Sequence, residues 1–395
     1  MPAVPGLRHP LTGLSACLHQ VFMHFGLDGG GPDGVSATRA GVSMFSRGDL
    51  IKIIIALAAS VLAGVLHFTG SSYVAVFVVG AIALGGLAAT IGESTDHLGT
   101  YLSPAATGIV QSAVGNLPEL CVSIFALRAG LVTVVQASLI GSILGNSLLV
   151  LGLAFLVGSA RHKILVFDAA APRMIAAMLL LAVSALLLPT LASVMHLPAG
   201  GHEDKLALVC AGVLLVVFLI SVKTMLDGSQ RTLPADAHET EDRWPLWLAL
   251  TVLSLAGLAA LFVSDWFVDA LSPAIETLGI SQAFAGLVIV AIVGNAVENV
   301  VGIQFAARNR ADLAVSVILN SSLQVAVALI PVLVFVSYFM GGVPFTLVIP
   351  PMLAVSMMLA AIIGVVVSAD GRADMVDGAA LVGLYIIIAA IFWWG

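Results

Sequence analysis

The sequence predicts an all-α polytopic membrane protein with eleven transmembrane helices, arranged as one leading helix and two inverted five-helix repeats. Three observations predict this fold class. The 395-residue chain is 60% hydrophobic and only 9% charged, with a mean hydropathy of +1.12. It contains eleven apolar segments long enough to cross a bilayer core of about 30 Å. A polar motif occurs twice inside those segments.

The composition excludes an ordinary soluble domain, in which about 25% of the residues are charged. Lipid is therefore the expected outer solvent. The net charge of -7 is small for this length, and nothing indicates binding of nucleic acid. The three cysteines, Cys17, Cys121 and Cys210, are an odd number, and two of them lie inside apolar segments. We therefore predict neither a disulfide framework nor a cysteine metal site.

The chain divides into five parts. Residues 1–46 are rich in Gly and Pro and lack the apolar core of a signal peptide, so we expect a disordered extension there, with Met44 as an alternative start. A leading helix (47–70), a first five-helix repeat (71–226), an acidic linker (227–243) and a second five-helix repeat (244–395) follow. The apolar segments have the approximate limits 50–67, 72–91, 103–127, 132–158, 171–195, 205–226, 244–264, 281–307, 312–338, 345–369 and 374–394.

Basic residues predict the orientation, because cytoplasmic loops of membrane proteins are enriched in Lys and Arg. With the N-terminus inside, only Arg128 and Lys205 lie outside. The inside set is Arg8, Arg39, Arg47, Lys52, Arg161, Lys163, Arg173, Lys223, Arg231, Arg243, Arg308, Arg310 and Arg372. We therefore expect an inner or plasma membrane protein with a cytoplasmic N-terminus, a cytoplasmic linker and an external C-terminus.

Three pairs of similar stretches predict the repeat. TDHLGTYLSPA (95–105) resembles SDWFVDALSPA (264–274), at an offset of 169 residues, and VGNLPEL (114–120) resembles VGNAVEN (293–299), at an offset of 179. Polar stripes spaced by four follow each motif, at an offset of 178. Because each half has five spans, the second half enters the membrane inverted. Inverted repeats are typical of secondary transporters that bind an ion near the midplane.

The duplicated motif predicts a metal site. Asn116 and Glu119 are three residues apart, as are Asn295 and Glu298, so each pair shares one helix face. Each half thus offers one carboxylate and one amide oxygen, a donor set that suits a hard divalent cation such as Ca²⁺. An ionisable residue at this depth costs roughly 2.5–3.5 kcal/mol, which favours a functional role over a structural one.

Further polar residues near the motifs are weaker candidates. Ser142 and Asn146 in the first half, with Asn320 and Gln324 in the second, lie on the next helix and could complete the ligand shell. The alternative is that such residues only pack the helices. Asp96 and Asp265 precede the two motif helices and are candidates for an access path, or simply mark helix ends. His97 is expected at the membrane interface rather than as a ligand.

The two G-N-x-x-E motifs resemble the paired repeat motifs of the calcium/proton exchangers, a branch of the calcium/cation antiporter superfamily. VVQASLIGSILGNSLLVLG (134–152) and LNSSLQVAVALIPVLV (319–334) are similar to the helices that follow those motifs. The resemblance covers roughly residues 50–394. It implies a bacterial-type antiporter that exports Ca²⁺ in exchange for H⁺, without a cofactor, with Glu119 and Glu298 binding the cation.

Departures from the family pattern keep alternatives open. Asn299 stands where the family usually has His, and Pro-Glu-Leu in the first motif resembles the sodium/calcium branch. A Na⁺/Ca²⁺ exchanger, in which Na⁺ is the coupling ion instead of H⁺, therefore stays open. So do Mn²⁺ as the transported cation and a cation channel. An ATP-driven pump is disfavoured because no G-x-x-x-x-G-K-[ST] motif occurs. The oligomeric state is open too, with a homo-oligomer as one alternative.

Overall fold

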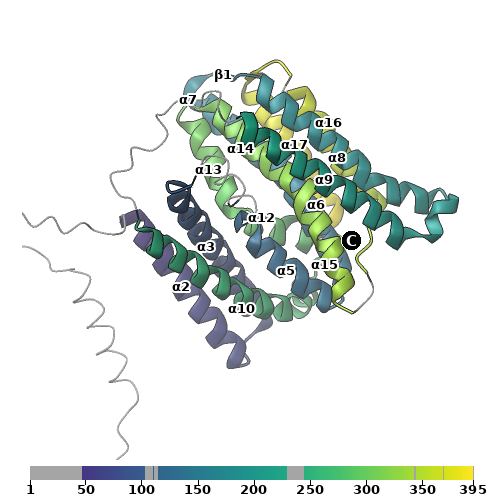
Figure 1. The fold of residues 1–395 in the computed structure, drawn as a ribbon. Helices are drawn as coiled ribbons and strands as arrows, with labels where there is room; N and C mark the ends of the chain where they lie inside the picture. The colour runs from purple at the N-terminus through teal and green to yellow at the C-terminus, as the bar shows by residue number, and fades with distance from the viewer. Residues whose placement is uncertain are drawn as a thin grey trace, which may run out of the picture. The chain divides into compact units, whose positions relative to one another are not determined.

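The computed structural model describes residues 47–102, 110, 114–228, 244–341, 344–367 and 369–394, and helices make up most of this part of the chain (Figure 1). The helices up to the end of the first half are α2 (Arg47–Phe68), α3 (Tyr73–Gly99), α5 (Leu117–Arg128), α6 (Val132–Leu144), α7 (Leu151–His162), α8 (Ala170–Val194) and α9 (Glu203–Gly228). The predicted helical class is confirmed.

The second half repeats this pattern of long and broken helices. Its α-helices are α10 (Leu246–Leu278), α11 (Gln282–Phe284), α12 (Ala291–Gly294), α13 (Ala296–Ala307), α14 (Ala311–Gln324), α15 (Ile330–Phe339), α16 (Pro351–Val367) and α17 (Met375–Trp393). Short elements of other kinds are the 3-10 helix η2 (Pro198–Gly201), the π-helical turns η1 (Gly145–Val150), η3 (Ala285–Val290) and η4 (Val325–Leu329), and the strands β1 (Leu165–Val166) and β2 (Arg372–Ala373).

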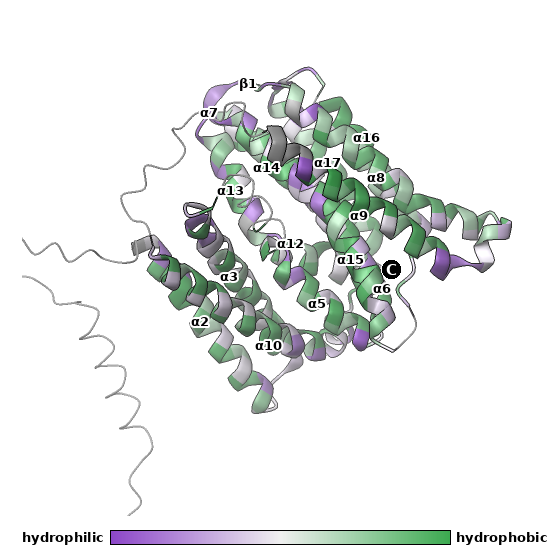
Figure 2. Cartoon of the chain, in the orientation of Figure 1, coloured by the Kyte–Doolittle hydropathy of each residue, from purple (hydrophilic) through white to green (hydrophobic). Residues whose placement is uncertain are grey.

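Within the described ranges, eight helices are long and apolar enough to cross a membrane, and nine if the bent run from Gln282 to Ala307 is one span. Helices α5 and α16, with 12 and 17 residues, are too short for the same test. The count of eleven therefore stays a prediction. Apolar side chains such as Leu181 (72% exposed) and Val209 (62%) point outward, as lipid-facing residues do. Figure 2 shows the hydrophobic residues running along most of the helices.

Helices α2, α3 and α10 pack together into one bundle (Figure 1). The remaining described helices pack mostly among themselves, and the short helices α5, α12 and α13 contact α3 or α10. Helix α6 and the π-helical turn η3 also approach each other closely. A Cβ atom on Gly141 would lie 2.6 Å from Cα of Leu287, and one on Gly286 would lie 2.9 Å from Cβ of Ala137. Only glycine permits these backbones to pack so closely.

The helix ends fix the register of the repeat. Helices α3 and α10 end at Gly99 and Leu278, which are 179 residues apart. The starts of α5 and α13 and the starts of α6 and α14 differ by the same 179 residues. The motif offset of 179 therefore also holds at these three helix ends, in place of the offset of 169 expected for the stretch before the motif. Asp265 lies inside α10, ten residues before the position equivalent to Asp96.

Three predicted segment ends also differ from the structure, and the first is that of the segment expected at 72–91, which continues as α3 to Gly99. The segment expected at 244–264 continues as helix to Leu278, with Pro273 inside it. The segment expected at 345–369 begins with a non-helical stretch, residues 344–350, because Pro350 and Pro351 interrupt helical hydrogen bonding and Pro351 is suited to a helix start.

Side chains satisfy the backbone of this non-helical stretch. Gln136 Nε2 donates to the carbonyl of Val348 (2.8 Å), and Thr190 Oγ1 donates to the carbonyl of Leu347 (3.1 Å). Thr190 Oγ1 also accepts from the backbone N–H of Ile349 (3.1 Å). Non-helical backbone is tolerated at membrane depth only where protein groups pair with it, so these bonds permit the departure from helix.

Contacts between loops gather several helix ends on one side. Strands β1 and β2 pair antiparallel, joining the connection after α7 to the connection after α16. His162 contacts the carbonyl of Ala307 through Nε2 at 3.1 Å, and Tyr101 donates to the carbonyl of Trp244 at 2.8 Å. When successive spans cross the membrane in opposite directions, the connections that these contacts link lie on the same side of the membrane.

Candidate cation site

Each motif lies at a break in a helix. Asn116 precedes α5 with φ -88° and ψ 8°, and Asn295 separates α12 from α13 with φ -104° and ψ 23°. The second break bends the chain by 65°. Pro118 is the second residue of α5, whereas Val297 occupies the equivalent place in α13. Because the second break forms without proline, the asparagine positions mark the breaks in both halves.

The breaks place both glutamates in the first turn of a helix. Glu119 lies in the first turn of α5, and Glu298 lies in the first turn of α13. Unpaired backbone N–H groups give a helix N-terminus a partial positive charge, which stabilises a carboxylate or attracts anions there. Glu119 is only 2% exposed, whereas Glu298 is partly buried. The two carboxylates therefore differ in access.

The two glutamates lie near each other, because each lies beside the motif glycine of the other half. A Cβ atom on Gly294 would lie 3.5 Å from Cβ of Glu119, and one on Gly115 would lie 3.7 Å from Oε1 of Glu298. The two carboxylates also interact electrostatically. The sequence-based expectation that both motifs meet is thus reproduced by the geometry of the described residues.

Hydrogen bonds surround Glu119 on one side only. Ser142 donates its hydroxyl to Oε1 of Glu119, and Asn295 Nδ2 donates to Ser142 Oγ at 2.8 Å. The other carboxylate oxygen, Oε2, is buried and has no hydrogen-bond partner among the described residues. A buried, unpaired acceptor of this kind is costly unless something binds to it. A cation or a proton would satisfy it.

The polar stripe of each half pairs with the motif of the other half. Asn116 Nδ2 donates to Oε1 of Gln324 (3.4 Å), and Asn146 Nδ2 donates to Oδ1 of Asn295 (3.3 Å). Asn116 is equivalent to Asn295 by the offset of 179, and Asn146 is equivalent to Gln324 by the offset of 178. The same exchanged pairing thus occurs twice, and four of the candidate ligands are joined by it.

The remaining candidates are less closely connected. Asn320 is partly exposed, and no hydrogen bond among the described residues joins it to either glutamate. Asp96 is exposed near the end of α3 and interacts electrostatically with Glu298. Asp265 is exposed inside α10, and no contact given for the described residues joins it to the site. The structure therefore brings Asp96 toward the site and separates Asp265 from it.

Some buried polar residues next to the site were not selected from the sequence. Ser321 Oγ accepts from Asn146 Nδ2 at 3.0 Å, and Ser147 and Ser322 form a hydroxyl pair at 3.0 Å. The sequence feature that could have indicated these residues is their position beside the polar stripes, since Ser147 follows Asn146 directly. A spacing of four residues does not include them. For Ser147, the reason is that a π-helical turn begins at Gly145 and changes which side chains face inward.

The site offers oxygen donors from both halves and a charge of -2 when both glutamates are ionised. The described residues place no Lys or Arg in an ion pair with either glutamate. Carboxylate and amide oxygens fit a hard divalent cation. The buried Oε2 atom of Glu119 has no hydrogen-bond partner among the described residues, and such a cation would interact with it.

Comparison with known proteins identifies the family. The model of the family described as sodium/calcium exchanger protein matches residues 72–226 and again residues 248–394. The chain belongs to this family. The exchanger family model thus matches each half of the chain once, on either side of the predicted linker.

Curated relatives in this family are similar over most of their length. The Ca(2+)/H(+) antiporter of Aphanothece halophytica is 32% identical over 345 residues, covering 82% of this chain and 92% of that protein. The Ca(2+)/H(+) antiporter ChaA of Bacillus subtilis (strain 168) is 34% identical over 343 residues, covering 84% and 95%. The family resemblance predicted from the sequence is confirmed.

Two solved structures share the fold. The structure of native YfkE matches with a TM-score of 0.75 and 28% identity, covering 87% of this chain and 99% of that one. The H+/Ca2+ exchanger CAX matches with a TM-score of 0.69 at 17% identity, covering 88% of this chain and 92% of that one, which supports the fold alone. The chain is therefore an integral membrane protein with an exchanger fold.

Proposed function

We propose that this protein is a secondary antiporter that exports Ca²⁺ from the cytoplasm in exchange for H⁺. The cation is bound by Glu119 and Glu298, with Asn116 and Asn295 as amide ligands. The observation that carries the proposal is the exchanged contact of the two glutamates with the motif glycines of the opposite halves. The named relatives are Ca²⁺/H⁺ antiporters, which are transporters rather than enzymes.

Charge counting supplies the mechanism. Two carboxylates close together in a medium of low dielectric cannot both stay charged without a partner. One Ca²⁺ neutralises both, and so do two protons, one on each carboxyl group. The empty site with its charge of -2 is costly to move through the membrane, so it must be loaded before access changes. The resulting cycle is electroneutral, with one Ca²⁺ out for two H⁺ in.

The hydrogen-bond pattern supports a proposed order in which the two carboxylates bind the cation. Glu298 is partly exposed and interacts with Asp96, so it meets an arriving cation first. Glu119 is buried and already accepts from Ser142, so its free Oε2 completes the coordination. Ser142, Asn146, Asn320 and Gln324 are proposed as additional ligands. Asp96 is proposed on the access path, and Asp265 keeps that role only as the weaker candidate.

The proposed orientation places the N-terminus in the cytoplasm of an inner or plasma membrane, with the C-terminus outside. The lysine and arginine distribution supports it. The contacts of β1 with β2 and of His162 with Ala307 agree with it, because both join connections from the basic side.

A relative movement of the bundle formed by α2, α3 and α10 is the proposed access switch. This bundle contains the first helix of each half, and it contacts α5, α12 and α13, which carry the motifs. A shift of the bundle along these helices would expose the glutamates to one side and then to the other. Rocking of one group of helices against another is common in inverted-repeat transporters.

The coupling ion is tested by Ca²⁺ uptake into proteoliposomes under an imposed pH gradient or an imposed sodium gradient. We expect the pH gradient to drive saturable uptake and the sodium gradient, at equal pH, to drive none. Uptake that follows sodium and ignores pH would move the protein to Na⁺/Ca²⁺ exchange. Mn²⁺ in place of Ca²⁺ tests the cation, and uptake without a counter-ion would indicate a channel.

A further inference from the structure

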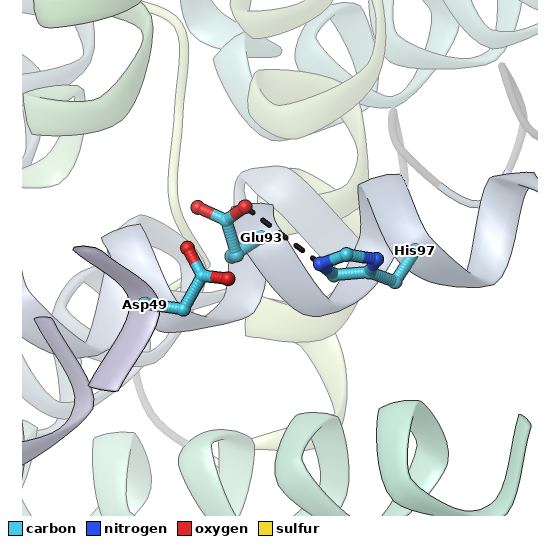
Figure 3. A group of neighbouring side chains, drawn as sticks. All are labelled: Asp49, Glu93 and His97. Atoms are coloured by element: carbon cyan, nitrogen blue, oxygen red, sulfur yellow. Dashed lines mark ion pairs between the residues drawn. The ribbon is translucent and has the colours of Figure 1, made fainter. Parts of the chain in front are cut away.

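A second group of charged side chains lies at the start of α2 and near the end of α3. Ligand atoms of Asp49, Glu93 and His97 all lie within 4.8 Å of one another (Figure 3). Glu93 and His97 are four residues apart on α3, so they share one face of that helix, and Asp49 reaches them from α2. The group therefore joins two helices of the bundle.

A positive charge already occupies this group. Lys52 forms an ion pair with Glu93, and its Nζ lies 3.8 Å from Oδ1 of Asp49. The Lys52 side chain is 49% exposed, so it can turn outward, whereas the side chains of Asp49 and His97 are each 11% exposed. With Lys52 in place, the two carboxylates and the ammonium leave a net charge of -1.

The imidazole of His97 is held with one nitrogen unused. Its ring stacks on Trp244, which is fully buried, with the ring centroids 4.4 Å apart and the planes inclined by 14°. The Nε2 atom is buried and has no hydrogen-bond partner among the described residues, and it lies 3.9 Å from Oε1 of Glu93. A buried imidazole nitrogen without a hydrogen bond, beside two carboxylates, is available to bind a cation.

We propose that Asp49, Glu93 and His97 form a second cation site, for a divalent transition metal such as Zn²⁺, with Lys52 as a tethered competitor. One imidazole nitrogen and two carboxylate oxygens are a common donor set for such ions, whereas Ca²⁺ prefers oxygen alone. A doubly charged ion neutralises Asp49 and Glu93 and releases Lys52. Water fills the fourth position on the exposed side that Lys52 leaves.

The ligand atoms, which lie within 4.8 Å of one another, must close in by up to about 1.5 Å to hold the metal. Ligand atoms about 2.0 Å from a tetrahedral ion lie roughly 3.3 Å apart, and Nε2 of His97 is 3.9 Å from Oε1 of Glu93. A contraction of this size is within the reach of side-chain rotation. Because Asp49 belongs to α2 and the other two ligands to α3, the metal would tie these helices together.

The site differs from the glutamate pair in position and in donors. Its effect would be on the bundle rather than on the transported ion, because it joins α2 to α3 beside Trp244, next to the end of the linker. Metal at this site is therefore expected to change the transport rate without being carried itself.

The test measures Zn²⁺ binding to the purified, tag-free full chain by competition with a fluorescent chelator. We expect His97→Gln to weaken binding at least tenfold and Lys52→Met to tighten it several-fold, because the competitor is removed. His162→Gln, an exposed histidine at the end of α7, is the matched control and should leave the affinity unchanged. Equal affinities in His97→Gln and the unmodified chain would overturn the proposal.

A second arm separates this site from the glutamate pair. Zn²⁺ affinity should persist in the double variant Glu119→Gln/Glu298→Gln, and its loss there would assign the ion to the midplane and refute the second site. If His97→Gln does not fold, Lys52→Met decides alone. Tighter binding supports the proposal, and unchanged or weaker binding contradicts it.

Discussion

Glu119 lies in an apolar segment at 2% exposure, with one carboxylate oxygen bonded to Ser142 and the other unpaired. A buried carboxylate with an unpaired oxygen fits the proposed role of Glu119 in binding a cation or a proton. The sequence predicted this residue and Glu298 because the motif is duplicated. It could not predict that Glu119 is the more buried of the two, because burial depends on how α5 packs against α12, not on the motif letters.

The first prediction concerns these two residues. Glu119→Gln and Glu298→Gln should each reduce Ca²⁺ flux in vesicles by about a hundredfold or more. With one carboxylate left, bound Ca²⁺ leaves an unpaired charge in low dielectric, which costs about 3–5 kcal/mol, and each 1.36 kcal/mol is a factor of ten. Folding should be kept, because neutral Gln is less costly to insert than Glu.

Glu276→Gln is the control for this experiment, since Glu276 is exposed in α10. It should transport at the unmodified rate. Melting in detergent is measured beside the flux. Near-normal flux in either motif variant would refute the site with two carboxylates, and loss of folding with loss of flux would instead indicate a structural role.

At the scale of elements, helix type and approximate position follow from hydropathy, but helix ends and breaks do not. The sequence pattern ended one segment at 264, whereas α10 continues to Leu278. The π-helical turns η1, η3 and η4 gave no periodic signal, although two of them directly follow or contain the polar stripes. Such turns depend on the packing of neighbouring helices and are frequent at functional sites.

The close approach of α6 to η3 gives the second prediction. Gly141→Ala should lower the free energy of unfolding by about 1–3 kcal/mol, because its Cβ would lie 2.6 Å from Cα of Leu287, a backbone atom that cannot move aside. Flux should fall as well, since Ser142 follows directly. Thermal melting in detergent measures the change.

Gly212→Ala is the matched control, because nothing lies within 4 Å of a Cβ atom at this position in α9. Alanine is the better helix former by about 1 kcal/mol, so this variant should melt at the same temperature as the unmodified protein or slightly higher. If Gly141→Ala melted like the control, the glycine would not be needed for the approach of the two backbones.

At the scale of the whole described unit, the division into two similar halves was predictable, because the duplicated motif is written in the order of the residues. The division into a bundle of α2, α3 and α10 and a set of other helices was not. It depends on which helices touch, and hydropathy carries no information on partners. The small residues at the contacts, such as Gly85 and Ala296, are visible only after the packing is known.

The third prediction tests the movement of the bundle. A Cβ atom on Gly85 in α3 would lie 3.6 Å from Cβ of Ala296 in α13, within the range of about 3.5–4.5 Å found in disulfides. In a background without native cysteines, Gly85→Cys/Ala296→Cys should exchange Ca²⁺ when reduced and lose most of its flux when oxidised. Proteoliposome uptake before and after a reductant measures the effect.

A pair inside the bundle is the control for the disulfide. A Cβ atom on Gly86 would lie 3.1 Å from Cβ of Ala56, so Ala56→Cys/Gly86→Cys joins α3 to α2 after a shift of a few tenths of an ångström. This bond should spare the flux, because both helices are expected to move together. Full flux in the oxidised Gly85→Cys/Ala296→Cys protein would show that the bundle does not slide against α13.

The exchanged pairing of Asn116 with Gln324 and of Asn295 with Asn146 bears on how such a chain evolves. The motif asparagine of each half is hydrogen-bonded to a residue of the other half. A single ancestral half could therefore form these hydrogen bonds only by associating with an inverted copy of itself. After duplication and fusion, a substitution of Gln324 affects the hydrogen bond to Asn116, and a substitution of Asn146 affects the hydrogen bond to Asn295. Compensating substitutions should therefore accumulate between the halves, which allows Asn146 and Gln324 to diverge while the motifs stay alike.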